Sequence, residues 1–344
     1  MPIEKTSTPV DINKRRIING EDADVMQLYP MKHTFAWEAY NVGNANHWLP
    51  TEISMQRDIE HWKSPTFLTP EEREAFQTVL GFFTTADSIA ANNIVIAFYK
   101  HISSPECRMY MLRQAYEEAI HTHAYQYIVE SLALDEGKIF NMYREVDAIY
   151  NKASFVLTFN EGIFNPEFET GTFENDQKFL ENMCVFALIL EGIFFYSSFA
   201  VMFGFQRQNK MMGSAEQIQY IMRDESQHLN FGINMINTIK EEQPELWTPE
   251  FQQHIVNLVR EAATLEYTYA QTVFPKGIFG MNAEGFKQYI EYIADRRLSR
   301  VGLPLQFNVT NPFPWMSEAI DLSKEKNFFE TRVTEYQTGG TLDW

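Results

Sequence analysis

The chain contains few residues of the kinds that cross-link proteins or interrupt helices. Its 344 residues include only two cysteines, Cys107 and Cys184, without a CxxC motif or a disulfide framework. So few cysteines are typical of proteins in a reducing compartment, and we expect a cytoplasmic protein. The 14 prolines and 16 glycines are spread along the chain, which favours long helices over a β-sandwich or a barrel.

Positive charge is scarce as well. The 28 Lys and Arg residues are outnumbered by 46 Asp and Glu residues, which gives a formal net charge of -18. Because phosphate binding needs an excess of Lys and Arg, the sequence excludes nucleic acid as a partner. Residues 1–20 carry four basic side chains but no apolar segment, so they are not a secretory signal. We expect a disordered leader there.

Long apolar runs are nearly absent. The one exception is Met183 to Phe205, where Glu191 is the only charged residue and no second such segment accompanies it. The length would span a bilayer, but a carboxylate at the centre would cost about 2.5–3.5 kcal/mol on insertion scales. The sequence therefore favours a buried core helix and no membrane association.

Most of the chain is predicted to be helical. Thr69-Pro70-Glu71-Glu72 combines an N-cap, a proline at the first helical position and a capping-box glutamate. Ser104-Pro105 and Thr248-Pro249-Glu250 give similar start signals. With the spacing of apolar residues, these signals predict helices over residues 51–62, 69–101, 104–132, 138–150, 176–207, 213–243, 248–275 and 282–301.

The remaining segments are expected to lack helices. Residues 154–176 are rich in Gly, Asn and Thr and are predicted to form a loop or hairpin. Residues from about 322 to 344 are mostly polar and carry Gly339-Gly340 near their end, which is typical of a flexible tail. A single helical domain over residues 21–321 is therefore expected between a leader and a tail.

Two Glu-x-x-His pairs stand on different predicted helices. They are Glu118-Ala-Ile-His121 and Glu225-Ser-Gln-His228. Residues i and i+3 share one face of a helix, so each pair presents a carboxylate and an imidazole together. In ferritin-like bundles with di-iron or di-manganese sites, two such pairs are joined by one carboxylate from each of two further helices.

Asp87 and Glu191 are the candidates for those further carboxylates. Asp87 lies on the apolar stripe of its predicted helix, and Glu191 is the lone charge of the apolar helix. A buried carboxylate is normally paired, protonated or bound to a metal. Surface pairs plus one satisfied glutamate would explain either motif alone, but not four helices in this order. Oxygen-rich sites with two nitrogens suit iron or manganese, so we expect an all-α ferritin-like bundle with a four-helix di-metal core and additional outer helices.

From about Trp48 onwards the chain resembles the radical-generating small subunit of class I ribonucleotide reductase. The resemblance implies six metal ligands, which are Asp87, Glu118, His121, Glu191, Glu225 and His228. It also implies a stored radical on Tyr125, four residues after the first metal histidine. Helix geometry agrees, because Glu118, His121 and Tyr125 fall within about 60° of each other around the axis. Without the metal motif, Tyr125 would be interpreted as a core aromatic with a satisfied hydroxyl.

Three apolar residues match the pocket that surrounds the radical in this family. Phe195 and Phe199 follow Glu191 by four and eight residues, and Ile221 precedes Glu225 by four, so all share the metal face. Such a pocket keeps water away from an oxidising species. Without the metal motif, these residues would be interpreted as ordinary core.

Three further matches imply export of the oxidising equivalent. In the family, the residue at Asp224 accepts a hydrogen bond from the first metal histidine, here His121. Trp48, in Asn46-His47-Trp48-Leu49-Pro50, matches the tryptophan that joins this network. Tyr336 matches the tyrosine that relays the radical to the large subunit. The resemblance thus implies a homodimer whose C-terminal tail binds a nucleotide-binding large (alpha) subunit.

The resemblance also bears on the metals. Glu191-Gly-Ile-Phe-Phe-Tyr and Asn311-Pro-Phe-Pro-Trp-Met are similar to a subgroup that uses a mixed manganese/iron centre. That subgroup has phenylalanine where Tyr125 stands and glutamate where Asp87 stands. The chain departs from it at both positions. We therefore expect two metal ions per chain, Fe/Fe in preference to Mn/Fe or Mn/Mn.

Two other classes of protein share parts of this pattern. A related di-metal oxidase or monooxygenase would need a substrate cavity beside the metals and would have no use for Trp48 and Tyr336. An iron-storage protein would gain nothing from an apolar pocket around Tyr125. The sequence therefore favours a ribonucleoside-diphosphate reductase, an oxidoreductase that is active only with its large subunit.

Overall fold

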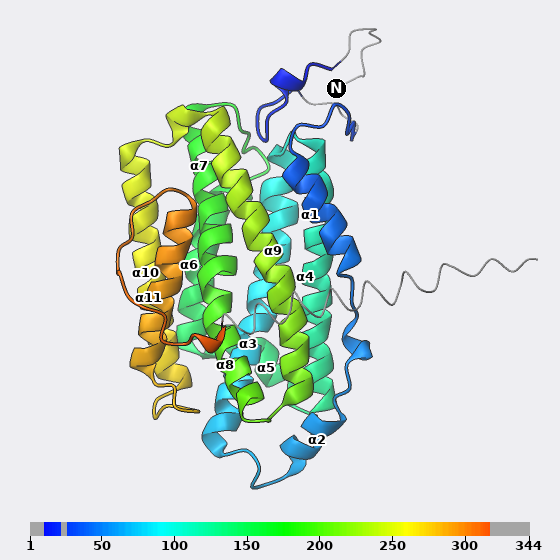
Figure 1. Ribbon diagram of the computed structural model, residues 1–344, viewed down its shortest axis with the longest axis vertical. Coiled ribbons are helices and arrows are strands. Elements are labelled where there is room, and N and C mark those ends of the chain that lie inside the picture. Colours follow the sequence, from blue (N-terminus) through cyan, green and yellow to red (C-terminus); the bar gives the residue numbers. More distant parts are fainter. Residues whose placement is uncertain (1–9, 22–25, 317–344) are drawn as a thin grey trace, which may run out of the picture.

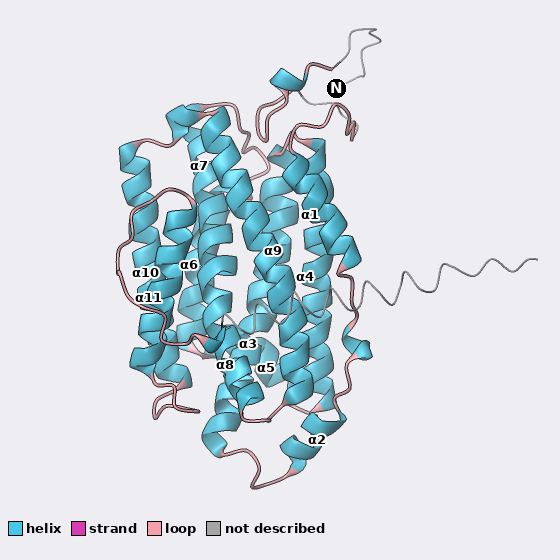
Figure 2. Cartoon of the chain, in the orientation of Figure 1, coloured by secondary structure: helices cyan, strands magenta, loops and turns pink. Residues whose placement is uncertain are grey.

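The protein is described by a computed structural model, which covers residues 10–21 and 26–316. Long helices run side by side along the molecule, as Figure 1 shows. Within the described ranges there is no β-strand, only two isolated bridges (Figure 2). The predicted all-α class is confirmed.

Four long helical segments form the centre of the bundle. They are α3 (Pro70–Asn92), α4 (Pro105–Ser131), α9 (Met212–Glu242) and a composite helix made of α7 (Phe173–Cys184), the π-helix η5 (Val185–Phe194) and α8 (Phe195–Arg207). A second π-helix, η3 (Asn93–Phe98), and the 3-10 turn η4 (Tyr99–His101) extend α3. The predicted helix over residues 69–101 is thus present, but its last part changes from an α-helix to a π-helix and a 3-10 turn.

Other helices pack around this centre. In Figure 1, α1 (Thr34–Ala45) lies along α4 on one side, while α10 (Pro249–Val273) and α11 (Ala283–Arg300) lie together on the other. The remaining elements are α2 (Gln56–Lys63), α5 (Glu136–Glu145), α6 (Asp147–Ile163) and the short 3-10 turns η1 (Ile12–Lys14), η2 (Pro50–Glu52) and η6 (Pro244–Leu246). The predicted helix over 51–62 is therefore a 3-10 turn followed by α2, and α1 was not predicted.

Local capping explains why several predicted starts are right. The Thr69 hydroxyl accepts a hydrogen bond from the Glu72 backbone N–H at 3.2 Å, and Glu72 accepts one from the Thr69 N–H at 3.0 Å. This is the predicted capping box. Ser104 and Thr248 likewise cap α4 and α10 with their hydroxyl groups.

The predicted loop over residues 154–176 is present only between residues 164 and 172, and the two ends of the range are helical. Helix α6 continues to Ile163, and α7 begins at Phe173. Val156, Asn160 and Ile163 are buried on one face of α6, and Asn160 accepts a hydrogen bond from the side chain of Asn182 at 2.8 Å. Packing of this face outweighs the weak local propensity of Gly, Asn and Thr. The predicted helix over 138–150 is also two helices, with a break at Val146.

The predicted disordered leader over residues 1–20 is wrong for residues 10–20. Ile17 and Ile18 are fully buried, and the Ile17 N–H donates a hydrogen bond to Glu242 at 2.8 Å. Ile18 forms an isolated bridge with Ile102. Two apolar side chains fixed in this way order the segment although it has no helical pattern of its own. Residues 1–9 and the expected tail over residues 322–344 lie outside the described residues.

Two helices are long and apolar enough to cross a membrane by length and composition. The most apolar window of Phe173–Arg207 is 100% buried, which confirms the interpretation as a core helix. Pro70–His101 also meets the criterion, contrary to the expectation of a single such segment, and its window is 61% buried. Both helices pack within the bundle, where the composite helix carries Glu191 and α3 carries Asp87.

Candidate metal centre

The six predicted ligands converge in the centre of the bundle. They come from α3, α4, η5 and α9, and all are 0% exposed: Asp87, Glu118, His121, Glu191, Glu225 and His228. Their ligand atoms form two groups, each with all atoms within 4.8 Å of one another. Asp87 and His121 belong to the first group, Glu191 and His228 to the second, and Glu118 and Glu225 to both. Two such groups could hold two neighbouring metal ions, with Glu118 and Glu225 available to both.

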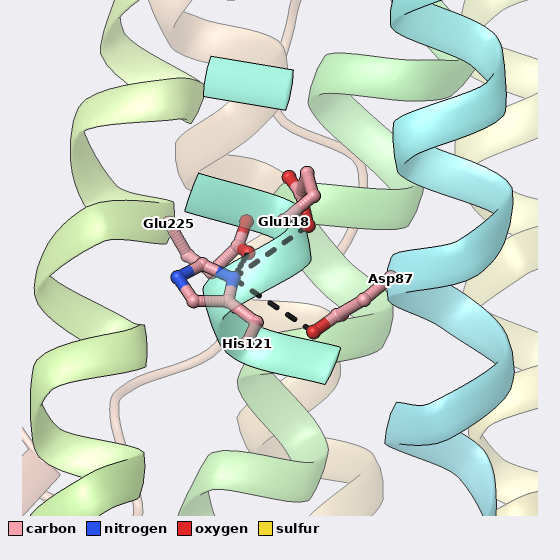
Figure 3. A group of neighbouring side chains, drawn as sticks. All are labelled: Asp87, Glu118, His121 and Glu225. Carbon is pink, nitrogen blue, oxygen red and sulfur yellow. Dashed lines mark ion pairs between the residues drawn. The ribbon is translucent and has the colours of Figure 1, made fainter. Parts of the chain in front are cut away.

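The two shared carboxylates each direct one oxygen to each histidine. His121 Nδ1 lies 3.6 Å from Glu118 Oε2 and 3.2 Å from Glu225 Oε1. His228 Nδ1 lies 3.3 Å from Glu118 Oε1 and 3.5 Å from Glu225 Oε2. Figure 3 shows the first group, where Asp87 Oδ2 completes the set at 3.7 Å from His121 Nδ1. Each end of the centre thus has one imidazole and carboxylate oxygens from different helices.

The ligand atoms have no hydrogen-bond partners. This holds for both carboxylate oxygens of Asp87, Glu118 and Glu225, for one oxygen of Glu191, and for Nδ1 of both histidines. Buried charged groups without partners are very unfavourable. Two divalent cations would satisfy these atoms together, and the mixture of oxygen and nitrogen ligands suits iron or manganese. The residues therefore fit a di-metal site.

Hydrogen bonds behind the centre orient both imidazoles. His121 Nε2 lies 3.3 Å from Asp224 Oδ2, and the same oxygen accepts a hydrogen bond from Trp48 Nε1 at 2.8 Å. His228 Nε2 lies 2.8 Å from Glu117 Oε2. Because each Nε2 is held by a carboxylate, each Nδ1 is directed inwards as a ligand. Asp224 and Trp48 thus lie where the resemblance places them.

Two contacts to the ligands were not foreseen from the sequence. The sequence did not identify His228 as the partner of Glu117. Gln114 was missed, although its side-chain N–H donates a hydrogen bond to Glu191 Oε1 at 2.8 Å. Both stand on α4 beside Glu118, at i−1 and i−4, and that proximity was the only available signal.

Repulsion among the carboxylates is reflected in their titration. Burial raises the pKa of Asp87 well above its usual value, and the charge of Glu118 raises it further. Burial also raises the pKa of Glu191, with a contribution from Glu225. For His121, burial opposes protonation, but the neighbouring carboxylates of Asp224 and Glu118 raise its pKa well above the usual value. The raised pKa values of Asp87 and Glu191 indicate that these carboxyl groups need a nearby cation to stay ionised together.

Tyr125 lies one turn beyond His121 and is completely buried. Its ring stacks on Phe83 with centroids 5.3 Å apart and an interplanar angle of 4°. Burial raises the pKa of Tyr125 well above its usual value, and the nearby charge of Asp87 adds to this effect. The hydroxyl has no hydrogen-bond partner of normal length, which argues against the alternative of a core tyrosine with a satisfied hydroxyl.

Two of the apolar residues expected around Tyr125 lie beside Phe83, the ring on which Tyr125 stacks. Phe199 lies 5.4 Å and Phe195 6.2 Å from Phe83, measured between ring centroids, and Ile221 is buried on α9. Phe83 itself was not predicted as part of this pocket. Its position one turn before Asp87 was the signal that would have identified it.

The described cavity beside His228 is small. It is lined by apolar side chains that include Met111, Met183 and Met235, and its volume of about 20 Å³ accommodates roughly one water-sized molecule. An organic substrate does not fit there. The di-metal oxidase alternative therefore lacks the substrate cavity it would need at this place. Tyr336 lies outside the described residues, so its relation to the centre is not defined by the structure.

Comparisons with known proteins agree with this geometry. The family model "Ribonucleotide reductase, small chain" matches residues 25–312. The ribonucleoside-diphosphate reductase subunit beta of Chlamydia pneumoniae is 52% identical over 335 residues, which are 97% of this chain and 96% of that protein. The ribonucleotide reductase R2 subunit from Clostridium botulinum superposes with a TM-score of 0.80 at 28% identity, covering 89% of this chain and 94% of that one. The dimanganese(II)-NrdF of Streptococcus sanguinis shares the fold, with a TM-score of 0.73 at 19% identity and coverage of 87% and 99%.

Proposed function

The chain belongs to the ribonucleotide reductase small-chain family as a small subunit of ribonucleoside-diphosphate reductase, and on this premise we propose that it binds two iron ions and stores an oxidising equivalent on Tyr125. A subunit of this family works with a large subunit, so the oxidant must leave the bundle. The proposal rests on one observation. The unpartnered ligand atoms of six side chains face each other, and the unpartnered hydroxyl of Tyr125 lies beside them.

Each ligand has a defined place in the proposed centre. Asp87 and His121 would bind one ion, Glu191 and His228 the other, and Glu118 and Glu225 both. When bound, the two ions supply the redox chemistry that activates oxygen. We propose Fe/Fe because Tyr125 and Asp87 are typical of the tyrosyl-radical type. Mn/Fe and Mn/Mn are the alternatives, since a dimanganese relative has the same fold.

Tyr125 and its surroundings suit storage of a radical. Oxidation removes one electron from the ring and the proton from the hydroxyl, which faces the carboxylate of Asp87 closely enough to be affected by its charge. Phe83 stacks on the ring, and Phe195 and Phe199 pack against Phe83, so this apolar cluster would exclude water and reductants. The same residue in a polar surrounding would lose its radical quickly.

A continuous hydrogen-bonded path supports transfer of the oxidising equivalent from the metal centre towards the large subunit. It runs from His121 through Asp224 to the indole of Trp48. We propose that the oxidising equivalent follows this path, then reaches Tyr336 in the tail and a cysteine of the large subunit. Tyr336 and the tail lie outside the described residues, so this last part rests on the family resemblance.

We also propose a homodimer in the cytoplasm. Large apolar side chains are exposed on α4 and on two elements that each pack against it, α1 and η3: Val42, Val95, Ile96, Leu112 and Tyr116. An apolar face of this kind is typical of an interface between subunits. The two cysteines are free and buried, which is compatible with a reducing compartment.

The function is tested by adding ferrous iron and oxygen to the apo-protein. We expect an absorption and electron-spin-resonance signal of a tyrosyl radical, and ribonucleotide reduction once the large subunit is added. A storage protein would instead continue to take up iron far beyond two ions per chain. Iron uptake of that kind without a radical would contradict the proposal.

Glu191→Ala is expected to lower the metal content from two ions per chain to one or fewer. The carboxylate is 0% exposed and joins the group that contains His228, so its loss removes a ligand that no neighbour replaces. Elemental analysis of purified protein measures the effect. Glu174→Ala, an exposed position of the same composite helix, is the matched control and should retain both ions. Full occupancy in Glu191→Ala would refute the ligand assignment.

A further inference from the structure

A second buried polar cluster lies outside the metal centre, between α6, α8 and α10. Lys152 Nζ forms an ion pair with Glu266 Oε1, and the Ser197 hydroxyl donates a hydrogen bond to Glu266 Oε2. Lys152 and Glu266 are both 0% exposed. Buried ion pairs seldom add stability compared with well-packed apolar residues, so the location of this pair calls for another explanation.

The ammonium group of Lys152 is enclosed by aromatic rings. Its Nζ lies 3.4 Å from the ring centre of Phe82, 4.0 Å from that of Tyr269 and 4.9 Å from that of Phe194. Burial lowers the pKa of Lys152 to about 8, against the opposing effect of Glu266, so the group is mainly protonated at neutral pH. A positive charge therefore sits directly on the ring of a buried tyrosine.

The same rings lead to Tyr125. Phe82 lies 5.6 Å from Tyr269 and 6.0 Å from Phe83, and Phe83 lies 5.3 Å from Tyr125, all between ring centroids. Tyr269 is a buried tyrosine, as Tyr125 is, and two rings separate them. A long-lived radical on Tyr125 has time to exchange across such a short aromatic path unless the exchange is energetically unfavourable.

Exchange of the radical between Tyr125 and Tyr269 would transfer one electron and one proton. Tyr269 would lose an electron and its hydroxyl proton, and Tyr125 would regain an electron and a proton. The Lys152 ammonium opposes loss of an electron from the adjacent ring. Both oxygens of Glu266 are engaged, one by Lys152 and one by Ser197, so this carboxylate is not free to take the proton.

We propose that the Lys152–Glu266 pair keeps Tyr269 reduced, so that the oxidising equivalent stays on Tyr125 until it leaves through Trp48. This inference rests on the proposed storage of the oxidant on Tyr125. The two directions from the centre differ in charge. Trp48 donates its indole N–H to the carboxylate of Asp224, whereas Tyr269 has an ammonium group directly over its ring, and the Glu266 carboxylate that also acts on Tyr269 is paired with that ammonium. A nearby anion favours oxidation and a nearby cation opposes it.

The first experiment uses the apo-protein and does not depend on Tyr125 or on metals. Lys152→Met with Glu266→Gln removes both charges with little change in volume. A ruthenium photo-oxidant is attached at Thr272→Cys, an exposed position on α10 three residues after Tyr269. Cys107 and Cys184 are buried, so they do not compete for the label. The yield of tyrosyl radical after a light flash is compared with and without Tyr269→Phe, so that the part due to Tyr269 is isolated.

The double variant removes the cation and the anion together, so only part of the effect of a unit charge remains. We expect the Tyr269 yield to rise at least about threefold, because the ammonium group lies directly over the ring, 4.0 Å from its centre. Lys210→Met with Glu72→Gln removes another Lys–Glu pair, at 2.6 Å, and should leave that yield unchanged. If the Lys152–Glu266 pair only holds α6 to α10, thermal unfolding will shift but the yield will equal that of the unmodified chain. Equal yields would overturn the inference. If the double variant does not fold, Lys152→Gln, which keeps a donor for Glu266, takes its place with the same expectation.

The second experiment uses the protein loaded with iron and oxygen. The lifetime of the Tyr125 radical should fall at least about threefold in the double variant, and Tyr269→Phe in that background should restore it. An unchanged lifetime in a folded variant with normal metal content would also overturn the inference. If the unmodified chain forms no Tyr125 radical, the proposed function fails, and the apo-protein experiment alone still decides whether Lys152 protects Tyr269.

Discussion

Tyr125→Phe is expected to bind two metal ions per chain, to form no tyrosyl radical and to lose ribonucleotide reduction to the background level. The substitution removes only the hydroxyl, whose loss of a proton accompanies oxidation. The ring remains stacked on Phe83, so the fold and the ligands should not change. Metal analysis, electron-spin-resonance and turnover with the large subunit measure the three parts of this prediction.

Tyr127→Phe is the matched control for that variant. Tyr127 stands two residues further along α4, is half-buried, and its hydroxyl donates a hydrogen bond to the carbonyl oxygen of Ile53 at 3.4 Å. It should keep the radical and the turnover. Substantial turnover in Tyr125→Phe would mean that the oxidant is stored on the metals, which would favour a centre that contains manganese and reject the Fe/Fe proposal.

Trp48→Phe is expected to separate storage from export. Phenylalanine cannot donate a hydrogen bond to Asp224, and its ring is much harder to oxidise than an indole. Metal content and the Tyr125 radical should persist, while reduction should fall by about 10- to 100-fold or more. Trp37→Phe, on α1 where the ring stacks on Tyr40, is the control and should have normal turnover. Normal turnover in Trp48→Phe would remove this residue from the path.

The outer end of the same path is tested in the tail. Tyr336→Phe should bind the large subunit normally but lose reduction, because the hydroxyl that must be oxidised is missing. Deletion of residues 327–344 should weaken binding itself, since an ordered tail has to offset its loss of entropy with several contacts. The metals and the Tyr125 radical should remain in both proteins. A Tyr336→Phe protein that binds and turns over normally would refute the relay.

Local geometry explains how much of the site the sequence determined. Glu118 and His121 lie on one face because residues three apart in a helix always do, and the same holds for Glu225 and His228. Glu191 was identifiable as the only charge in an apolar helix. The helix starts at Thr69 and Thr248 also depend on side chains a few residues away. Such features need no knowledge of distant contacts.

The tertiary structure decided the features that depend on residues far apart in the chain. Glu117 binds His228 across 111 positions, and Gln114 binds Glu191 across 77. The order of Ile17 and the helical state of α6 both come from packing against distant segments. Lys152 and Glu266 have no pattern in the sequence, because their attraction and their burial arise only once α6 and α10 pack together. Local periodicity fixes which face a residue occupies, but only the packed fold decides what that face meets.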